Sequence, residues 1–228
     1  MEPAASVTEG RASALPLEPG LDVRRLGRVP YAEALGLQTE LRDAHLAGTG
    51  RDSVLLLEHP DTVTFGRGAR EGHALLSDVE LRDAGYEVFR TNRGGDVTYH
   101  GPGQLVGYPI LDLSAHGRDV HAYLRRLEGV LIDVLGQFDI AARRRDGYAG
   151  VWLDEQQKIA SIGVGVRRWV TMHGFALNVS CDLERFRVMV PCGLAGVEMV
   201  SMSSVLGRSV ELDRVVDAVG SELQRVFA

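Results

Sequence analysis

The sequence predicts a single α/β domain of mixed α+β character, in which helices flank a mixed β-sheet. Two observations predict this class. Segments with the apolar spacing of amphipathic helices are interspersed with short apolar runs typical of buried strands. Several of these strand-like runs also follow one another directly, which favours a mixed sheet. With 228 residues and 45% hydrophobic side chains, the chain is long enough to bury one large core.

The first segment of the domain is expected to contain three strands and one helix. In chain order we predict a strand over 21–27, a helix over 30–48, a strand over 52–60, and a strand over 62–66 that extends the same sheet. Pro30 fits the first turn of the helix and Gly48 ends it. The run DSVLLLEHP is continuously apolar until Pro60, which predicts a strand buried on both faces.

The remaining elements are a mixture of helices and strands. They are a helix over 77–85, a strand over 86–91, a glycine-rich stretch over 94–103, a strand over 104–113, a helix over 119–138, strands over 149–153, 158–166 and 170–180, and a helix over 209–227. Ser77 and Glu80 form a capping-box pattern, and Gly85 ends that helix. Pro109 places its strand at an edge or a bulge. A leucine stripe at helical spacing predicts core positions at Leu124, Leu127, Leu131 and Leu135.

Composition and charge exclude several classes of function. The net charge of −6 argues against a general affinity for nucleic acid, and no apolar run is long enough to span a membrane. The densest basic cluster, ARRRD at 142–146, is predicted to be a solvated turn, with a docking patch for an acidic partner as the alternative. Residues 1–20 lack the regions of a secretory signal. They are expected to be a disordered leader before the domain at 21–228, and the location is expected to be cytoplasmic.

The two cysteines are predicted to have different roles. In a cytosolic protein both are expected to be free thiols, and they fall short of a zinc set. Cys192 lies between Pro191, which fixes the backbone before the thiol, and Gly193, which tolerates unusual dihedral angles. We therefore predict Cys192 as a nucleophile, with a small buried hydrophobe as the alternative, and a structural role for Cys181.

The segment NRGGDVTYHGPGQ, residues 92–104, is predicted to be a ligand-binding loop. It lacks the glycine and lysine spacings of dinucleotide and nucleoside triphosphate sites. Its glycines allow a ligand to approach the backbone closely, and Arg93, Thr98, His100 and Gln104 supply directed polar groups. A tight β-turn with incidental polar residues is the alternative interpretation.

Lys158 is the only lysine in the chain, although lysine and arginine together number 25. An arginine guanidinium is effectively never deprotonated in a protein, whereas a lysine among apolar neighbours can act as a base. Lys158 begins the apolar run KIASIGVGV, so we predict that it marks a place where a removable proton is required. A compositional accident is the alternative.

Taken together, these segments resemble the lipoyl (octanoyl) transferase family. The resemblance covers the chain from Leu21 onward and rests on six motifs in order: LLLEHP, RGGDVTYHGPGQLVGYPI, GYAGVW, KIASIG, HGFALNV and VPCG. It implies a fold related to biotin and lipoate protein ligases, with a small second sheet beside the mixed one. It also implies that no ATP, metal or free cofactor is needed.

The resemblance further implies a site and a reaction. The acyl-thioester nucleophile matches Cys192, and its lysine partner matches Lys158. The substrate-binding segments match Arg93, Gly94, Gly95, Asp96, Val97, Thr98, Tyr99, His100, Ser161, Ile162, Gly163, Gly174, Phe175 and Ala176. The donor is octanoyl-acyl carrier protein. The acceptors are lysines on lipoyl domains of 2-oxoacid dehydrogenase complexes and on the glycine cleavage H protein, and the reaction is the first step of endogenous lipoate synthesis.

Three other functions remain open on the sequence. An ATP-dependent lipoate or biotin ligase would share the fold but needs no cysteine, so the PCG setting of Cys192 argues against it. A non-catalytic acyl-binding protein would bind the chain without forming a covalent adduct. A cysteine hydrolase would release octanoate to water, but the sequence shows no convincing Cys–His–Asn set.

Overall fold

The computed structural model describes residues 20–190 and 196–228. The expected leader, except Gly20, and the predicted nucleophile Cys192 lie outside the described residues. Among the described residues, no helix is long and apolar enough to cross a membrane.

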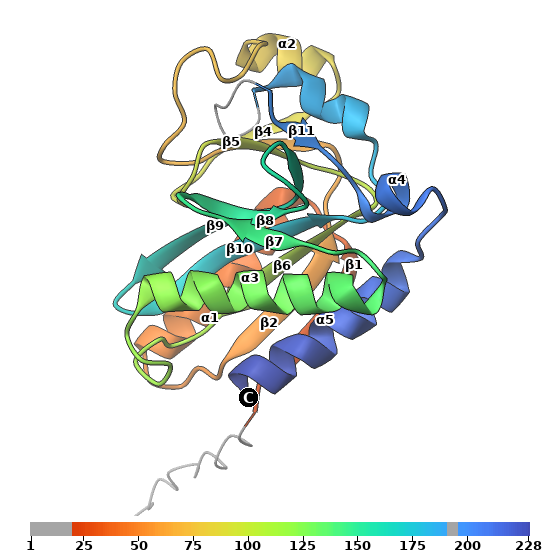
Figure 1. Ribbon diagram of the computed structural model, residues 1–228. Coiled ribbons are helices and arrows are strands. Elements are labelled where there is room, and N and C mark those ends of the chain that lie inside the picture. The colour runs from red at the N-terminus through yellow and green to blue at the C-terminus, as the bar shows by residue number, and fades with distance from the viewer. Residues whose placement is uncertain (1–19, 191–195) are drawn as a thin grey trace, which may run out of the picture.

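One large mixed sheet forms the centre of the fold (Figure 1). In spatial order its strands are β1 (Asp22–Arg28), β2 (Ser53–Glu58), β6 (Gln104–Ile110), β10 (Val170–Asn178), β9 (Gln157–Arg167), β8 (Tyr148–Trp152) and β7 (Arg143–Arg145), with β11 (Glu198–Met199) paired to β9. β1 pairs with β2 in parallel and β11 with β9 in parallel, whereas the other neighbours are antiparallel. The predicted mixed sheet is confirmed, and so is the burial of β2, in which only Glu58 is not buried.

Helices cover both faces of the large sheet (Figure 1). The long ones are α1 (Tyr31–Leu46), α3 (Val120–Gln137) and α5 (Leu212–Phe227), and the short α4 (Met202–Leu206) precedes α5. α1 packs on one face through Ala34, whereas α3 and α5 share a core cluster on the other face. The predicted leucine stripe of α3 is confirmed, because Leu127, Leu131 and Leu135 are fully buried and Leu124 packs against the core.

A small second sheet holds the strands β4 (Glu87–Arg90), β3 (Thr62–Phe65) and β5 (Val97–His100), in that order. The helix α2 (Asp78–Asp83) and the 3₁₀ helix η1 (Leu183–Val188) pack around it. Their shared core contains Val63, Leu81 and Phe186. The predicted capping box of Ser77 and Glu80 is present at the start of α2. The second sheet implied by the family resemblance is therefore confirmed.

The prediction that residues 62–66 extend the large sheet is wrong. β3 pairs in parallel with β4 and antiparallel with β5, and all three strands belong to the second sheet. Pro60 has no N–H group to continue the ladder after β2, and the Thr62 hydroxyl donates to the Pro60 carbonyl at 2.7 Å. The chain therefore turns at Pro60 and begins a new sheet.

Pro109 does not lie at an edge, because β6 is central, between β2 and β10. Pairing of β6 with β10 is instead interrupted beyond Gly107. The hydroxyl of Thr171 fills the interruption. It accepts the Leu111 N–H at 2.9 Å and donates to the Pro109 carbonyl at 2.7 Å. A side chain thus replaces ladder bonds at the position where proline has no donor.

Two further segments differ from expectation. The glycine-rich stretch 94–103 contains the regular strand β5. The three arginines of the basic cluster 142–146 form the short edge strand β7, and the turn begins only at Asp146. Arg143 and Arg145 each contact the Glu155 carboxylate, and Arg144 contacts Glu128. These ion pairs and the pairing with β8 account for an extended conformation at this cluster.

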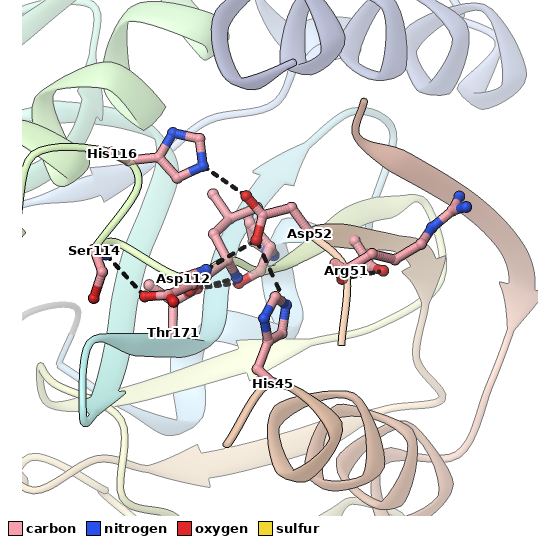
Figure 2. Close-up of polar contacts among 10 residues, drawn as sticks. His45, Arg51, Asp52, Asp112, Ser114, His116 and Thr171 are labelled. Carbon is pink, nitrogen blue, oxygen red and sulfur yellow. Dashed lines mark hydrogen bonds and ion pairs between the residues drawn. The ribbon is translucent and has the colours of Figure 1, made fainter. Parts of the chain in front are cut away.

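A polar cluster joins the end of α1 to the start of β2 and the loop after β6 (Figure 2). The carboxylate of Asp52 accepts the Asp112 N–H at 2.9 Å and bonds Nε2 of His116 at 2.6 Å. Nε2 of His45 lies 3.5 Å from the same carboxylate. None of these residues lines the cavity described next, so this cluster is part of the scaffold.

Candidate active site

Residues of both sheets line one cavity of about 520 Å³, a volume typical of small-molecule sites. The apolar lining residues include Ile162, Phe175, Ala176, Phe186, Met189 and Met199. The polar and charged ones include Arg70, His73, Arg93, Asp96, His100 and Lys158. A lining that contains both kinds of side chain suits a ligand with an apolar chain and a polar group.

Glycines allow the segment before β5 to lie directly on β9. Gly163 and Gly174 are opposite each other in the β9–β10 pair. A Cβ atom on Gly163 would lie 2.8 Å from the Gly94 carbonyl oxygen, and one on Gly174 would lie 2.1 Å from the Gly107 carbonyl oxygen. The Gly94 N–H donates to the Val164 carbonyl at 2.8 Å. Any larger residue at these glycines would push the wall of the cavity apart.

Arg93 is buried and held rigidly by the second sheet. Its Nη2 donates to the Thr64 carbonyl at 2.7 Å and to the Thr64 hydroxyl at 3.0 Å, and its Nη1 donates to the Gly94 carbonyl at 3.0 Å. The guanidinium therefore brings a fixed positive charge to the cavity wall. A fixed cation there favours an anionic group of a ligand or a nucleophile.

His100 is a neutral side chain in the polar part of the cavity. Burial, with smaller contributions from nearby His59 and Arg93, lowers its pKa to about 3. Its Nδ1 bonds the side-chain oxygen of Gln104 at 2.9 Å, and the Gln104 amide donates to Asn178 at 2.9 Å. Since the glutamine oxygen only accepts, Nδ1 carries the proton and Nε2 keeps a lone pair.

Further buried aromatic and imidazole groups surround His100. Burial lowers the pKa values of His59 and His173 to about 4 and raises the pKa of Tyr31 to about 12. His59 donates to the Val29 carbonyl at 2.7 Å, so its Nε2 accepts the Tyr108 hydroxyl at 2.7 Å. All of these groups are neutral near pH 7, and the charge of the polar region is carried elsewhere.

Lys158 is buried in β9, with 3% of the residue exposed, and lines the cavity. Its Nζ donates to the Ala149 carbonyl at 3.1 Å and lies 4.8 Å from the centre of the Trp152 ring. Gly150 makes room for it, because a Cβ atom there would lie 2.7 Å from Cε of Lys158. The GYAGVW segment therefore positions the single lysine of the chain.

His73 and Asp96 form a second polar pair on the cavity wall. Nδ1 of His73 hydrogen-bonds Oδ2 of Asp96, and Oδ1 of Asp96 accepts the Val97 N–H at 2.8 Å. The carbonyl of His73 accepts the N–H of Val190 at 2.8 Å. This loop is thus bonded to the last described residue before the VPCG cysteine.

The cavity brings together nearly all of the predicted site residues that the structure describes. Lys158 and the predicted substrate-binding residues line it, with two exceptions. Gly94 bonds to β9, and Tyr99 is a core residue whose hydroxyl donates to Asp61 at 2.7 Å. Cys192 lies outside the described residues. Cys181 is a buried free cysteine whose pKa burial raises to about 12, in keeping with its predicted structural role.

Several lining residues were not predicted from the sequence: Tyr31, Arg70, His73, Tyr108 and His173. His173 adjoins the predicted Gly174, and the HGFAL motif was the available signal for it. His73 lies in a loop without any local pattern, so only the tertiary structure places it at the site. Within the described ranges, no group of three or more His, Cys, Asp or Glu side chains could hold a metal ion.

Solved structures of low sequence identity share the fold. A lipoate protein ligase from Thermoplasma acidophilum is 16% identical, with a TM-score of 0.70 over 91% of this chain and 83% of that chain. A biotin protein ligase from Aquifex aeolicus, solved with biotin and ATP, is 11% identical, with a TM-score of 0.53 over 90% and 69%. The architecture is therefore that of the lipoate and biotin protein ligases, as predicted.

Sequence comparisons narrow this class. The model of the lipoyl protein ligase A/B catalytic domain matches residues 30–224. Octanoyltransferases of Geobacter metallireducens and Solibacter usitatus are each 51% identical to this chain. The two alignments cover 85% and 90% of this chain and 87% and 92% of those proteins. The chain therefore belongs to the octanoyltransferase family of acyltransferase enzymes.

Proposed function

We propose that this enzyme transfers an octanoyl group from the phosphopantetheine thioester of acyl carrier protein to a lysine of a lipoyl domain. An acyl thioester on Cys192 is the intermediate, and Lys158 is the proton-transfer partner of that cysteine. The observation that carries the proposal is the buried Lys158 amine on the wall of a cavity with an apolar part, in a chain of the octanoyltransferase family. Arginine could supply charge at this position but could not exchange a proton.

The first half-reaction exchanges one thioester for another. The Cys192 thiolate attacks the octanoyl carbonyl, the C–S bond to phosphopantetheine breaks, and Lys158 gives its proton to the departing sulfur. The fixed charge of Arg93 favours the thiolate before attack. Because reactants and products are both thioesters, the step is nearly balanced and the acyl group stays reactive.

The second half-reaction makes an amide. The amine of the acceptor lysine attacks the acyl-Cys192 carbonyl, the C–S bond breaks, and Lys158 takes up a proton while Cys192 leaves as a thiolate. Amide formation drives the transfer forward. We assign the apolar lining at Ile162, Phe175 and Ala176 to the octanoyl chain, and the polar lining to the reacting carbonyl.

Mass spectrometry after incubation with octanoyl-acyl carrier protein tests the proposal. We expect an adduct of about 126 Da, the mass of an octanoyl group that replaces a hydrogen, on Cys192. Cys192→Ala should abolish it. Cys181→Ala is the matched control and should retain it, because Cys181 is buried in the core of the second sheet. Stoichiometric binding without an adduct would instead identify an acyl-binding protein.

A second candidate is an ATP-dependent ligase, which the fold shared with lipoate and biotin ligases favours. Such an enzyme would activate free octanoate as an adenylate and would not need Cys192. One assay distinguishes the ligase from the transferase. ATP consumption with free octanoate, undiminished in Cys192→Ala, would establish the ligase and exclude the proposed transferase.

The proposed partners are those that the family resemblance implies. We propose acyl carrier protein as donor, and as acceptors the lipoyl domains of 2-oxoacid dehydrogenase complexes and the glycine cleavage H protein. An acceptor domain with its target lysine changed to arginine should stay unmodified while Cys192 is still acylated. The cytoplasmic location stays a prediction, to be checked by fractionation of the source cells.

A further inference from the structure

The pair of His73 and Asp96 has the arrangement of a general base. With Nδ1–H of His73 donating to the Asp96 carboxylate, the other ring nitrogen, Nε2, is the one that can accept a proton. No group within residues 20–190 and 196–228 forms a hydrogen bond with that Nε2. The His73 side chain is 24% exposed and also lines the cavity, so this residue belongs to the cavity wall and is partly open to solvent.

The backbone fixes His73 beside the segment that leads to Cys192. Its carbonyl accepts the Val190 N–H at 2.8 Å, and the Leu75 N–H donates to the Val188 carbonyl at 2.8 Å. Ala74 and Met189 form an isolated antiparallel bridge between these bonds. Cys192 follows Val190 by two positions in the sequence. The loop of His73 is therefore bonded to the chain next to the proposed nucleophile.

Proton balance in the second half-reaction requires more than one acceptor. A lysine acceptor, with a pKa of about 10.4, arrives as an ammonium ion and must lose two protons to become an amide. In the acyl-enzyme, Lys158 has already given its proton to phosphopantetheine and can take back only one. The other proton needs a second base that reaches both the cavity and solvent.

The other cavity groups do not meet this need. His100 and His173 are buried, and burial lowers their pKa values to about 3 and 4. In the acyl-enzyme Lys158 has lost its proton, so the cations that remain in the described lining are Arg70 and Arg93, and Asp96 is the carboxylate beside them. These cations disfavour an entering ammonium ion and favour its deprotonation at the boundary. His73 is the partly exposed imidazole of the lining, and it has a carboxylate partner.

We propose that His73, oriented by Asp96, is the general base that deprotonates the acceptor lysine. The inference rests on the proposed function, since it concerns the second half-reaction of that cycle. Nε2 of His73 removes one ammonium proton, and the amine lone pair then forms the C–N bond. As the C–S bond breaks, Cys192 leaves with the electron pair and Lys158 takes the second proton. The imidazolium returns its proton to solvent, so the cycle releases one proton overall.

Single-turnover transfer from pre-acylated enzyme tests this role. His73→Gln should acylate normally with octanoyl-acyl carrier protein but transfer to a lipoyl domain about 100-fold more slowly at neutral pH, the usual contribution of a general base. The deficit should shrink as pH rises, because the fraction of free amine increases about tenfold per pH unit. Hydroxylamine, which is neutral at the assay pH, should react equally fast with both acyl-enzymes.

Two more variants separate catalysis from folding. Asp96→Asn can still accept the Val97 N–H but no longer binds the His73 proton with a charge, so it should show the same selective loss. His116→Gln also removes a histidine paired with an aspartate, Asp52, but His116 does not line the cavity, and transfer should be unchanged (Figure 2).

The outcomes are distinct. Normal transfer by His73→Gln, or an equal loss with the lipoyl domain and with hydroxylamine, would overturn the base role and leave the proposed function standing. Failure of the wild-type enzyme to form the Cys192 adduct would overturn the proposed function, and this inference with it.

Discussion

At the scale of single residues, Gly150 matters because of the side chain that it accommodates. Its φ of +125° is strained for other residues, and a Cβ atom would lie 2.5 Å from the Ala160 carbonyl oxygen, 2.7 Å from Cε of Lys158 and 3.1 Å from Nζ of Lys158. We expect Gly150→Ala to destabilise the fold by at least about 1 kcal/mol and to displace the lysine. Cys192 acylation should fall much more than the fraction of folded enzyme, as measured by adduct formation and urea unfolding.

Gly117→Ala is the matched control for that prediction. Gly117 also has a positive φ, +99°, but a Cβ atom there meets no heavy atom within 4 Å. The control variant should lose a similar amount of folding stability through its strained φ and keep its acylation rate. If the two alanine variants lose acylation equally, backbone strain alone is responsible, and the contacts of the new methyl group with Ala160 and Lys158 are unimportant.

Lys158→Arg separates the charge of the lysine from its proton. The variant keeps a cation beside the cavity but loses a group that can give up its proton, so Cys192 acylation should fall by about 100-fold or more. Arg126→Lys, on the exposed face of α3, serves as a control for conservative basic substitution. Near-normal acylation in Lys158→Arg would leave the lysine with an electrostatic role only.

At the scale of elements, Thr171 holds β6 and β10 together where Pro109 interrupts their pairing. Thr171→Val keeps the shape but leaves the buried Leu111 N–H and Pro109 carbonyl without this hydroxyl. We expect a loss of about 1–3 kcal/mol in the free energy of unfolding, measured by urea denaturation.

Thr39→Val is the control for Thr171→Val. The Thr39 hydroxyl donates to the Leu35 carbonyl within α1 at a half-buried position, so its loss should cost less than about 0.5 kcal/mol. Equal costs for the two variants would show that the Pro109 interruption needs no bridging side chain.

The same elements show how far sequence reasoning reaches. Apolar spacing and caps predicted the leucine stripe of α3 and the buried strand β2 correctly, because these signals are local. Which strands pair is not a local property. Residues 62–66 have the pattern of a strand in either sheet, and Pro109 at a central position is tolerated only because distant Thr171 replaces the missing bonds.

At the scale of the whole molecule, the site depends on how the two sheets meet. The Arg93 segment precedes β5 in the second sheet, Lys158 and Gly163 lie on β9, and Gly174 lies on β10. The sequence motifs identified these segments, and the fold brings them to one cavity. His73 could not be predicted in this way, because its partner Asp96 is 23 positions away and no motif in its own loop signals a contact.

Burial of three histidines around the site gives the whole molecule a pH-dependent stability. Burial lowers the pKa of His100 to about 3 and those of His59 and His173 to about 4, whereas an unfolded histidine has a pKa of about 6.5. Between these values the unfolded chain binds protons that the folded chain excludes, so the free energy of unfolding increases with pH. The contribution of these histidines to stability is fully present above about pH 6.5 and is lost as the pH falls toward 4. In this range the free energy of unfolding changes with a slope that approaches about 1.4 kcal/mol per pH unit for each histidine.

Urea unfolding of wild-type protein and two variants across this pH range measures that slope. His100→Asn removes one imidazole that binds a proton in the unfolded chain but not in the folded one. The slope should therefore decrease by up to about 1.4 kcal/mol per pH unit, whatever the effect of the substitution on stability at neutral pH. His121→Asn, at an exposed position at the start of α3, should keep the wild-type slope. The two variants are matched, since each removes one imidazole but only His100 is buried in a neutral form. Equal slopes for all three proteins would mean that His100 becomes protonated in the folded enzyme as readily as in the unfolded chain.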